Sequence, residues 1–497
     1  MNSDKLKLDR FTSLVTIYGS RTIMHVRTEA FIQDSTAAVQ NDTLQSRLRV
    51  LTSFTVKRNA AFAQLEDGEA LRDQARAIKE RTISNLDAYL SELEDNILRM
   101  SGKVHWARTG EEACAIVLDL ARKRGVRRVV KGKSMVTEEI ELNEALEREG
   151  IEAVETDLGE YIVQLAHEKP SHILAPAVHK SKEDISDLFA DKLGTMNLKD
   201  AREMTVVARK RLREYFCTAD MGITGANFAV AETGTIVLVE NEGNIRLSTT
   251  LPRIHVAVMG IEKVIPSLDD LAVFLKILAR SASGQKMSSY VSFITGARRT
   301  GEVDGAGEFH LIVLDNGRTR ILADEEMRES LYCLRCGACL NVCPVYQKLG
   351  GHAYGSVYSG PIGSILTPAF AGLEKTSDLP FASTLCGACR EICPVRIDIP
   401  RILLKLRSEW SEGGHDHRAG SSVFERLAIR VWAFAMGRPF VYNSLFRIAA
   451  FLQGPMLEDG KIKSLPLSFG AWTQNRDFPA LARKSFRSMW RDDHRGE

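Results

Sequence analysis

Apolar residues recur every three or four positions between residues 67 and 99, with charged residues between them. This spacing is typical of a helix that buries one stripe of its surface. The stripe consists of Leu71, Ala75, Ile78, Leu86, Leu90, Leu93 and Ile97. We therefore expect a helical arm that packs against the rest of the chain by one face.

Short apolar runs alternate with helical stretches from residue 104 to about residue 322. The expected strands are 126–130, 151–156, 173–177, 228–231, 235–240 and 255–259, and the expected helices are 111–124, 138–149 and 182–193. Gly125 follows the first helix as a stop, and Thr137 caps the second. Alternating helices and strands predict an α/β layer structure with a mainly parallel sheet.

A third pattern lies near the end of the chain, where residues 424–452 are apolar and aromatic. Arg430, Arg438 and Arg447 interrupt this stretch, and a Gly-Arg-Pro sequence at 437–439 divides it. Each arginine at the centre of a bilayer would cost roughly 2.5–3.5 kcal/mol on insertion scales, which argues against a membrane-spanning helix. Two amphipathic helices remain, docked on protein or lying on a membrane surface, and docking on protein is the favoured interpretation.

The composition is that of a soluble globular protein, with 44% hydrophobic and 26% charged residues in 497 residues. The net charge of +2 hides an asymmetry, because residues 396–497 hold 17 Lys and Arg against 11 Asp and Glu. Residues 1–395 hold 49 against 53. This balance argues against a protein that binds nucleic acid over its whole surface, but leaves a basic tail that could meet an acidic partner or lipid headgroups.

Nine cysteines narrow the chemistry. Cys114 and Cys217 stand alone, whereas seven others fall within residues 333–393. Residues 1–10 are polar and no apolar segment of an export signal follows them, so we expect a cytoplasmic protein; Met24 is an alternative start. Clustered thiols in such a chain indicate metal ligation in a reducing compartment rather than disulfides.

The first cysteine run consists of Cys333, Cys336, Cys339 and Cys343, followed directly by Pro344. These spacings are those of bacterial ferredoxins, in which three closely spaced cysteines wrap one iron–sulfur cluster and the fourth ligates a second cluster. A structural zinc site is the weaker alternative, because zinc sites usually pair two separated Cys-x2-Cys knuckles.

A second run repeats the first at Cys386, Cys389 and Cys393, before Pro394. The sequence Cys-Gly-Ala-Cys occurs in both runs, which makes the segment an internal repeat. Ser383 stands at the position that matches Cys333, so the repeat is one thiol short.

Crossed ligation then predicts two clusters. The first takes Cys333, Cys336, Cys339 and Cys393, and the second takes Cys343, Cys386 and Cys389. For the second cluster the fourth ligand stays open among Ser383, Thr384, His352, water and a ligand from a partner, and a three-iron cluster is a further alternative. Two neighbouring clusters favour an electron relay over a purely structural role.

Several segments resemble the lactate-utilisation domain, namely residues 130–140, 154–161, 222–227 and 231–235. With the cysteine runs, the chain resembles the lactate utilisation protein B family, the iron–sulfur subunit of a three-protein L-lactate oxidation system, over about residues 50–480. The resemblance implies an electron carrier for the oxidation of L-lactate to pyruvate, with partner proteins from the same system. It also implies a first domain folded like sugar-phosphate isomerases.

We therefore predict four parts. They are an N-terminal extension that could be disordered (1–45), a helical arm with an isomerase-like α/β domain (46–322), an α-helical ferredoxin-type module with two [4Fe-4S] clusters (323–402) and a basic amphipathic helical C-terminal region (403–497).

The α/β domain offers a candidate pocket for a small carboxylate such as L-lactate. Lys133 and Ser134 come after a strand and before a helix, where anions are commonly bound. The opposite wall would come from Asn227, Glu232, Thr233 and Gly234. Ordinary turns and helix caps explain the same residues equally well, and His167, His172 and His179 are expected to be structural.

Three hypotheses follow for the function. The first is an electron-transfer protein in lactate oxidation, with no catalytic residue of its own. The second is an enzyme that oxidises lactate in the α/β pocket and uses the clusters as internal acceptors. The third is a scaffold whose clusters only stabilise docking surfaces. The motifs leave open whether the chain is an enzyme.

Overall fold

The computed structural model describes residues 24, 26–413, 420, 422–465, 470, 473 and 476–494. The chain forms two compact units, Met1–Trp410 and Ser411–Glu497. The first unit holds the arm, the sheet and the cysteine runs, and the second holds the C-terminal helices.

The N-terminal arm is entirely helical from Thr28 onward. It consists of η1 (Thr28–Ala30), α2 (Phe31–Gln40), α3 (Asp42–Leu48), α4 (Val50–Phe62), α5 (Gly68–Ser84) and α6 (Leu86–Arg99). The expected stripe between residues 67 and 99 is buried except for the half-buried Leu71, but a non-helical Asn85 (φ −128°, ψ 38°) divides it between α5 and α6.

Residues 28–45 differ from the predicted extension, because they are folded. Asn41 caps α3 with its side chain, and Phe31 packs edge-on against Tyr354 at a ring separation of 5.8 Å. The contact between Phe31 and Tyr354 joins segments far apart in the chain, so local periodicity does not predict it. Residues 1–23 of the predicted extension lie outside the described residues.

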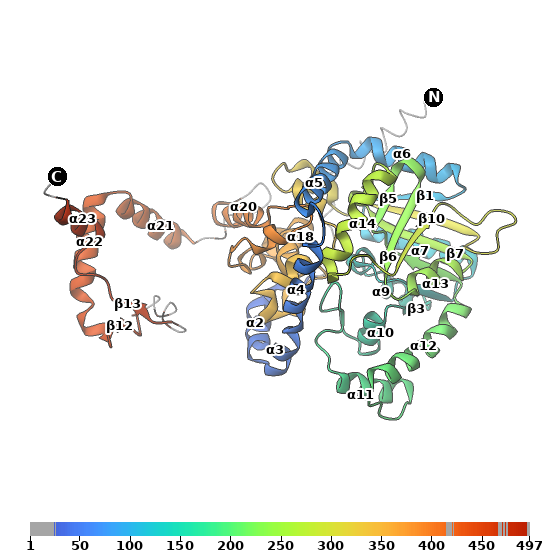
Figure 1. Cartoon of the computed structure of the whole chain (residues 1–497), viewed down its shortest axis with the longest axis horizontal. Helices are drawn as coiled ribbons and strands as arrows, with labels where there is room; N and C mark the ends of the chain where they lie inside the picture. The colour runs from blue at the N-terminus through green and yellow to red at the C-terminus, as the bar shows by residue number, and fades with distance from the viewer. Residues whose placement is uncertain are drawn as a thin grey trace. The chain divides into compact units, whose positions relative to one another are not determined.

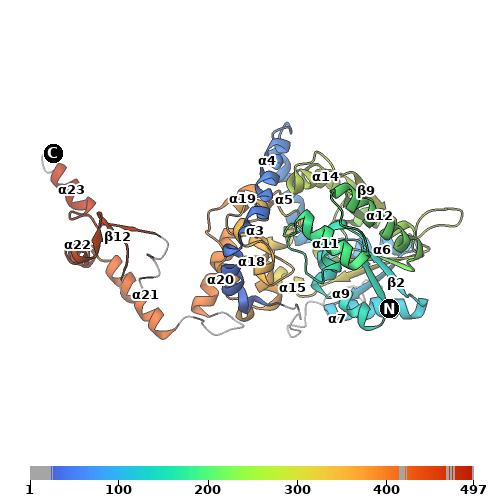
Figure 2. The ribbon, with the colours of Figure 1, turned by 90° about the horizontal axis from the view of Figure 1, so that it is seen from below.

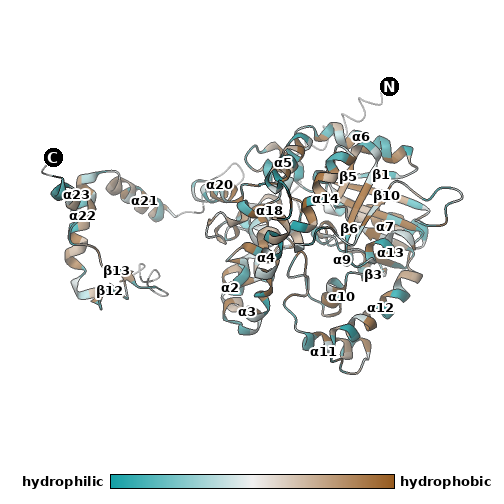
Figure 3. Ribbon diagram, in the orientation of Figure 1, coloured by the Kyte–Doolittle hydropathy of each residue, from teal (hydrophilic) through white to brown (hydrophobic). Residues whose placement is uncertain are grey.

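The main sheet is entirely parallel, in the order β1-β10-β7-β4-β2-β3. Its strands are β1 (Lys103–Ala107), β2 (Arg128–Lys131), β3 (Glu152–Glu155), β4 (Met221–Thr224), β7 (Ile254–Gly260) and β10 (Glu308–Leu314). Alternate residues of β7 enter two different cores, Val256 and Val258 one and Ala257 and Met259 the other. A parallel sheet covered on both faces confirms the predicted α/β class, and the central strand β7 is mostly apolar and buried along its length (Figure 3).

A second, four-stranded sheet of mixed direction adjoins the first, in the order β8-β5-β6-β9. Its strands are β5 (Phe228–Val230), β6 (Thr235–Glu240), β8 (Val264–Ile265) and β9 (Tyr290–Ile294). The expected strands 228–231 and 235–240 thus exist but belong to this smaller sheet, because only four residues, 231–234, turn the chain back between them.

Helices connect the strands of the α/β domain. They are α7 (Gly110–Arg124), α8 (Met135–Glu139), α9 (Leu142–Arg148), α10 (Leu158–Leu165), α11 (Lys182–Leu193), α12 (Ala201–Thr218), α13 (Asn244–Thr250), α14 (Leu268–Ser283) and α15 (Arg318–Ala323). The α7 helix ends at Gly125 (φ 61°), as predicted.

Two local predictions in this domain are wrong. Residues 138–149 are not one helix, because Glu141 adopts a left-handed conformation (φ 52°) between α8 and α9, and Ser134 rather than Thr137 caps α8. Residues 173–177 form turns instead of a strand. The backbone N–H of Ser171 bonds to the carbonyl of Pro176, which closes the segment on itself.

The cysteine module consists of short helices. It contains η4 (Arg328–Tyr332), α16 (Ala338–Val342), α17 (Tyr346–Leu349), η5 (His352–Tyr354), α18 (Gly360–Ala371), η6 (Leu373–Lys375), η7 (Leu379–Phe381), α19 (Ala388–Ile392) and α20 (Ile399–Glu412). The blue arm helices α3 and α4 lie on the same side of the first unit as the orange cysteine module in both views (Figures 1 and 2). Contacts of α4 with α16, and of α2 and α3 with α17, hold the arm against the module.

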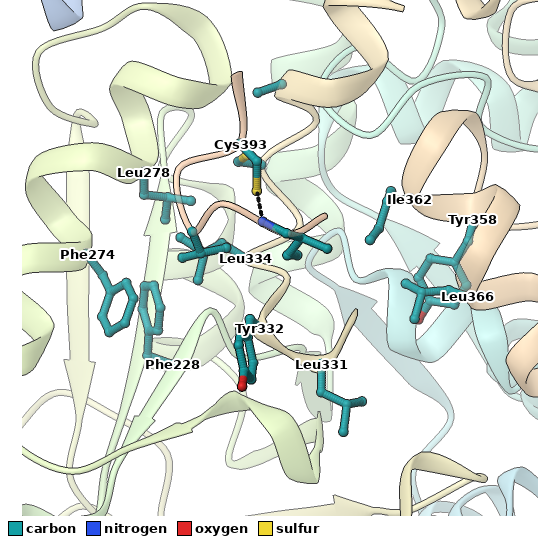
Figure 4. Packing of buried hydrophobic residues seen from close by; sticks show 14 of the residues in the cluster. Phe228, Phe274, Leu278, Leu331, Tyr332, Leu334, Tyr358, Ile362, Leu366 and Cys393 are labelled. Carbon is teal, nitrogen blue, oxygen red and sulfur yellow. Dashed lines mark hydrogen bonds between the residues drawn. The ribbon is translucent and has the colours of Figure 1, made fainter. Parts of the chain in front are cut away.

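One hydrophobic core joins the α/β domain to this module. Phe228, Phe274 and Leu278 of the domain belong to the same buried cluster as Leu331 and Leu334 of the module (Figure 4). The module is therefore part of the main body of the first unit.

The second unit contains two amphipathic helices. Its elements are α21 (Val423–Met436), α22 (Pro439–Leu452), η8 (Gly454–Met456), β11 (Leu457–Glu458), β12 (Lys461–Ile462), β13 (Phe478–Pro479) and α23 (Phe486–Asp493). The break falls at Gly437 and Arg438, where the sequence placed it, and no helix among the described residues is long and apolar enough to cross a membrane.

Candidate iron–sulfur centre

The two cysteine runs repeat the same backbone path. Arg335 (φ 60°) and Leu385 (φ 55°) directly precede Cys336 and Cys386, and both adopt a left-handed conformation. Gly337 (φ 76°) and Gly387 (φ 83°) then stand directly before the short helices α16 and α19. Since α16 packs against α19, the two runs lie face to face.

Four thiols border one small cavity of about 20 Å³. They belong to Cys333, Cys336 and Cys339 of the first run and to Cys393 of the second. Most of the other lining residues are apolar, among them Ile173, Leu334, Ile362, Val395, Ile397 and Ile399, and Arg335 is the charged residue of the lining. We call these four thiols the first set. They are the same four that crossed ligation assigns to one cluster.

Backbone amides donate to sulfur atoms of the first set. The N–H of Arg335 lies 3.4 Å from Sγ of Cys333, and the N–H of Ile397 lies 3.4 Å from Sγ of Cys393, the bond drawn dashed in Figure 4. Burial raises the pKa of the Cys336 thiol to about 12 and that of Cys393 to about 11. Bare thiolates are therefore unfavourable here, and a positively charged metal centre would replace their protons.

Two buried arginines from the arm lie next to the first set. Arg72 of α5 donates to the carbonyl of Cys393 through Nε (3.1 Å) and Nη2 (2.8 Å). Arg58 of α4 donates to the carbonyl of Ile392 at 3.2 Å, and its charge acts on Cys336 and Cys393. No local pattern in the sequence predicts either arginine, because both contact residues more than 300 positions away.

The remaining three thiols form a second set, Cys343, Cys386 and Cys389. Cys343 and Cys389 are buried, and burial raises the pKa of the Cys389 thiol to about 12. Cys386 is exposed, and hydrogen bonds from the Ala388 amide and the Thr384 side chain lower the pKa of its thiol.

The candidate fourth ligands of the second set have partners elsewhere. The Ser383 hydroxyl accepts the backbone N–H of Leu385 at 3.1 Å, in a turn just before Cys386. His352 bonds through Nε2 to the carbonyl of Lys169 at 2.7 Å, and its ring lies against His179. Of the candidate oxygen ligands, Thr384 contacts the second set, because its side chain forms a hydrogen bond with the thiol of Cys386.

Closely grouped thiols with amide donors and mostly apolar surroundings suit iron–sulfur clusters. The first set offers four sulfur donors and the second three, which is the donor chemistry that such clusters require. No group of three or more His, Cys, Asp or Glu side chains in the described part of the chain could hold a single metal ion.

A larger cavity of about 380 Å³ adjoins the first set. It lies at the carboxyl ends of β2, β4 and β7 and is closed by Leu334, Arg335 and Cys336 of the first run. Ligands of open α/β sheets commonly bind at this edge. We call it the sheet-edge cavity.

The structure divides the predicted carboxylate pocket. Lys133, Ser134 and Asn227 line the sheet-edge cavity. Glu232, Thr233 and Gly234 do not. They pack against α6 and the start of α14, where the amide of Asn96 donates to the carbonyl of Glu232 at 3.1 Å. The short turn between β5 and β6 carries them away from the cavity.

Charged groups cluster where the sheet meets the first run. The buried Arg318 pairs with Glu139 at 2.8 Å and with Glu262 at 2.7 Å. Arg335 stacks on Tyr358 at 4.4 Å and lies 3.7 Å from Glu262. Arg318 holds the pKa of Glu262 at about 2 despite its burial, so this carboxylate stays charged.

The predicted histidines have structural contacts. His172 is buried, with Nε2 at 2.9 Å from Oδ1 of Asn341 and with Nδ1 accepting the N–H of Leu174 at 3.0 Å. His179 pairs with Glu168 at 2.6 Å. His167 ends α10 with a positive φ of 55°. These contacts tie loops to the module.

Three family models match the chain. The LUD domain matches residues 90–314, a 4Fe-4S dicluster domain matches residues 329–397, and the C-terminal model of lactate utilisation protein B matches residues 405–495. The parallel sheet and the two thiol sets therefore belong to an iron–sulfur protein with a LUD domain.

Curated relatives cover nearly the whole chain. Lactate utilization protein B of Bacillus licheniformis is 45% identical over 454 residues, which span 91% of this chain and 93% of that protein. The protein of the same name from Bacillus subtilis (strain 168) is 42% identical over 482 residues, spanning 95% and 98%. The chain belongs to the lactate utilization protein B family and has a role in lactate utilisation.

One solved structure also matches. It is a duf162 family protein from Deinococcus radiodurans, 17% identical, covering 46% of this chain and 98% of that chain with a TM-score of 0.24.

Proposed function

We propose that the chain is an electron-transfer protein that carries electrons during the oxidation of L-lactate to pyruvate, so that lactate serves as a carbon source. The observation that carries this proposal is the crossing of the runs, with Cys393 of the second beside three thiols of the first. Ferredoxins with two clusters use the same crossing to place the clusters next to each other.

The thiol sets suit two [4Fe-4S] clusters, each of which accepts and releases one electron when bound. The surrounding residues control the energy of that electron. Around the first set, the amides of Arg335 and Ile397 and the charge of Arg58 offset negative charge on sulfur. The apolar wall excludes water. Hydrogen bonds and burial of this kind determine the reduction potential of a cluster.

The second set is suited to exchange electrons with another protein. Cys386 and Thr384 are exposed, so this set reaches the surface, whereas each cysteine of the first set is buried or half-buried. With only three thiols it would hold a [4Fe-4S] cluster with one ligand other than cysteine, or a [3Fe-4S] cluster. The buried Tyr346 lies beside this set, because its backbone N–H donates to Sγ of Cys343 at 3.5 Å, and its ring lies 6.0 Å from that of the buried Tyr354.

The proposed partners are the other proteins of the lactate-oxidation system, in the reducing cytoplasm where clustered thiols persist. The second unit offers a surface for them. Phe424, Trp432, Phe440 and Phe451 on α21 and α22 are more than half exposed. We favour docking on a partner protein. Binding to anionic liposomes that salt reverses would instead support a peripheral membrane contact.

A second candidate function is lactate oxidation by the chain itself. It is favoured by one observation, that the sheet-edge cavity borders both Lys133 and Cys336. A substrate bound there would lie directly beside the first set. The two candidates differ in whether the isolated chain reacts with lactate.

The test is EPR spectroscopy with iron and sulfide analysis on protein purified without oxygen. Clusters that dithionite reduces, and that L-lactate reduces only when the partner proteins are present, would support the carrier. Reduction by L-lactate alone would make the chain the enzyme. Zinc in place of iron would overturn both functions.

A further inference from the structure

The sheet-edge cavity brings an anion-binding surface to the first thiol set. One wall is formed by Lys133 and Asn227 at the ends of parallel strands, and another by Arg335 and Cys336 of the first run. Its volume of about 380 Å³ lies within the range of small-molecule sites, roughly 300–1,000 Å³.

The acidic residues that line this cavity are already engaged. Asp157 accepts the backbone N–H groups at the start of α10, and Glu240 accepts those of Ile245 and Arg246. Glu242 accepts the N–H of Leu158 at 3.1 Å. Glu262 pairs with Arg318. Each carboxylate therefore accepts at least one hydrogen bond or pairs with a cation, and burial together with the charge of Asp157 raises the pKa of Glu242, which favours its neutral form.

Three cations share one carboxylate at the end of β7. Glu262 pairs with Arg318 at 2.7 Å and lies 3.7 Å from Arg335, and its charge also acts on Lys263. The buried Nη1 of Arg335 has no hydrogen-bond partner among the described residues. Lys133 lies 3.9 Å from Glu160. Partly buried cations that share one carboxylate favour a bound anion, because an anion restores the stabilisation that they lose with bulk water.

We propose that the sheet-edge cavity binds the carboxylate of a 2-hydroxy acid such as L-lactate, or of its 2-oxo product, with Lys263 and Arg335 as the binding cations. This proposal rests on the proposed function for the choice of acid. The carboxylate then lies against the loop that carries Cys333 and Cys336. Asn227 and Ser134 supply polar groups from the opposite wall.

A ligand in this position is coupled to the first thiol set by charge. A bound carboxylate adds negative charge beside the cluster and lowers its reduction potential. By linkage, reduction of the cluster weakens binding of the carboxylate by the same factor. Product release would then follow the arrival of an electron.

The experiment uses the full chain with its clusters assembled. L-lactate and pyruvate are titrated against dithionite-reduced and oxidised protein, and both equilibrium binding and the EPR signal of the first cluster are recorded. We expect saturable binding, tighter to the oxidised form, and a shifted EPR signal without reduction of the oxidised protein.

The diagnostic variant is Lys263→Gln, and the matched control is Lys276→Gln on the exposed side of α14. Loss of one charged hydrogen bond should weaken binding about tenfold or more in the first variant and leave the control unchanged. Iron content of both variants checks that the clusters are intact.

Three results would overturn the proposal. They are no saturable binding to the wild-type chain, binding by Lys263→Gln equal to wild type, and inorganic phosphate competing as well as lactate, which would indicate an unselective anion site. Reduction by lactate with partner proteins present is measured separately, so loss of the proposed function and loss of this site give different patterns.

Discussion

Cys336 is buried, between a small apolar cavity and the sheet-edge cavity, whereas Cys386 is exposed at the surface. The first set has four thiols, apolar walls, and two arginines from the arm beneath it. The second has three thiols and an exposed threonine. The same local motif therefore serves two purposes, since one environment protects a cluster and the other allows contact with a partner.

The strongest way to break this comparison is to remove one cysteine from each set. In Cys336→Ala we expect loss of the first cluster and a large fall in the melting temperature, because metal binding at a buried site contributes directly to folding. In Cys386→Ala we expect loss of second-set iron with a much smaller fall. Iron analysis and thermal unfolding followed by circular dichroism measure both. Equal destabilisation would contradict the difference between the sets.

The support of the first set by the arm is tested with Arg72→Met. Arg72 is 4% exposed and its loss leaves the carbonyl of Cys393 without these donors. We expect a destabilisation of about 2–4 kcal/mol in urea unfolding. The control is Arg81→Met, at a residue that lies on α5 like Arg72. This change breaks an ion pair near the surface with Asp270 of α14 and should cost less than about 1 kcal/mol. Similar costs would show that α5 supports the site only by general packing.

We expect acid to destabilise the segment around His172, whose neighbour Ile173 borders the cavity of the first thiol set. Burial lowers the pKa of His172 to about 4, below its ordinary value near 6.5. Between these values the unfolded chain binds a proton that the folded chain does not, so stability falls as the pH drops from about 6.5 to about 4. The slope is up to about 1.4 kcal/mol per pH unit.

The measurement compares unfolding free energies of wild type and His172→Gln between pH 5 and 6.5. The variant should lose that part of the slope, while His167→Gln, at an exposed position, keeps it. Because Ile173 borders the first cavity, iron release from the first set should also quicken in acid. An unchanged slope in His172→Gln would contradict this role.

The smallest effect on stability is expected from Ser383→Cys, which restores the position that matches Cys333. The change lies at the half-buried edge of the second set. We expect any three-iron EPR signal to be replaced by a four-iron signal, with the first set unaltered. A persistent three-iron signal would show that the turn at Ser383 holds position 383 away from the cluster.

The thiol sets were open to prediction because ligand spacing is a local property. The positions of Cys333, Cys336 and Cys339, together with the repeat that supplies Cys393, were sufficient to group four thiols that the structure places around one cavity. The parallel strands were accessible only in part. The short apolar runs of β2, β3 and β7 predicted them, whereas β1, β4 and β10 of the same sheet were not predicted.

What the sequence did not reveal depends on contacts between distant segments. No sequence motif marks Arg58, Arg72 or Lys263. Their roles become visible only in the folded chain, where the arm and the end of β7 lie next to the cysteine runs. Gly234 looked like part of a pocket because its turn is glycine-rich. Its backbone instead packs against Asn96, where an added Cβ would lie 2.7 Å from the main chain.

The core shared by the sheet and the cysteine module limits how this chain can be taken apart. Leu331 and Leu334 pack with Phe274 and Leu278 of the α/β domain, and Arg58 and Arg72 reach the second run from the arm. A fragment cut at the edges of the cysteine runs would expose these leucines and lose both arginines. The ferredoxin-like part is consequently not an independent domain. Transferring it to another protein would require transferring the arm and the packing face of α14 as well.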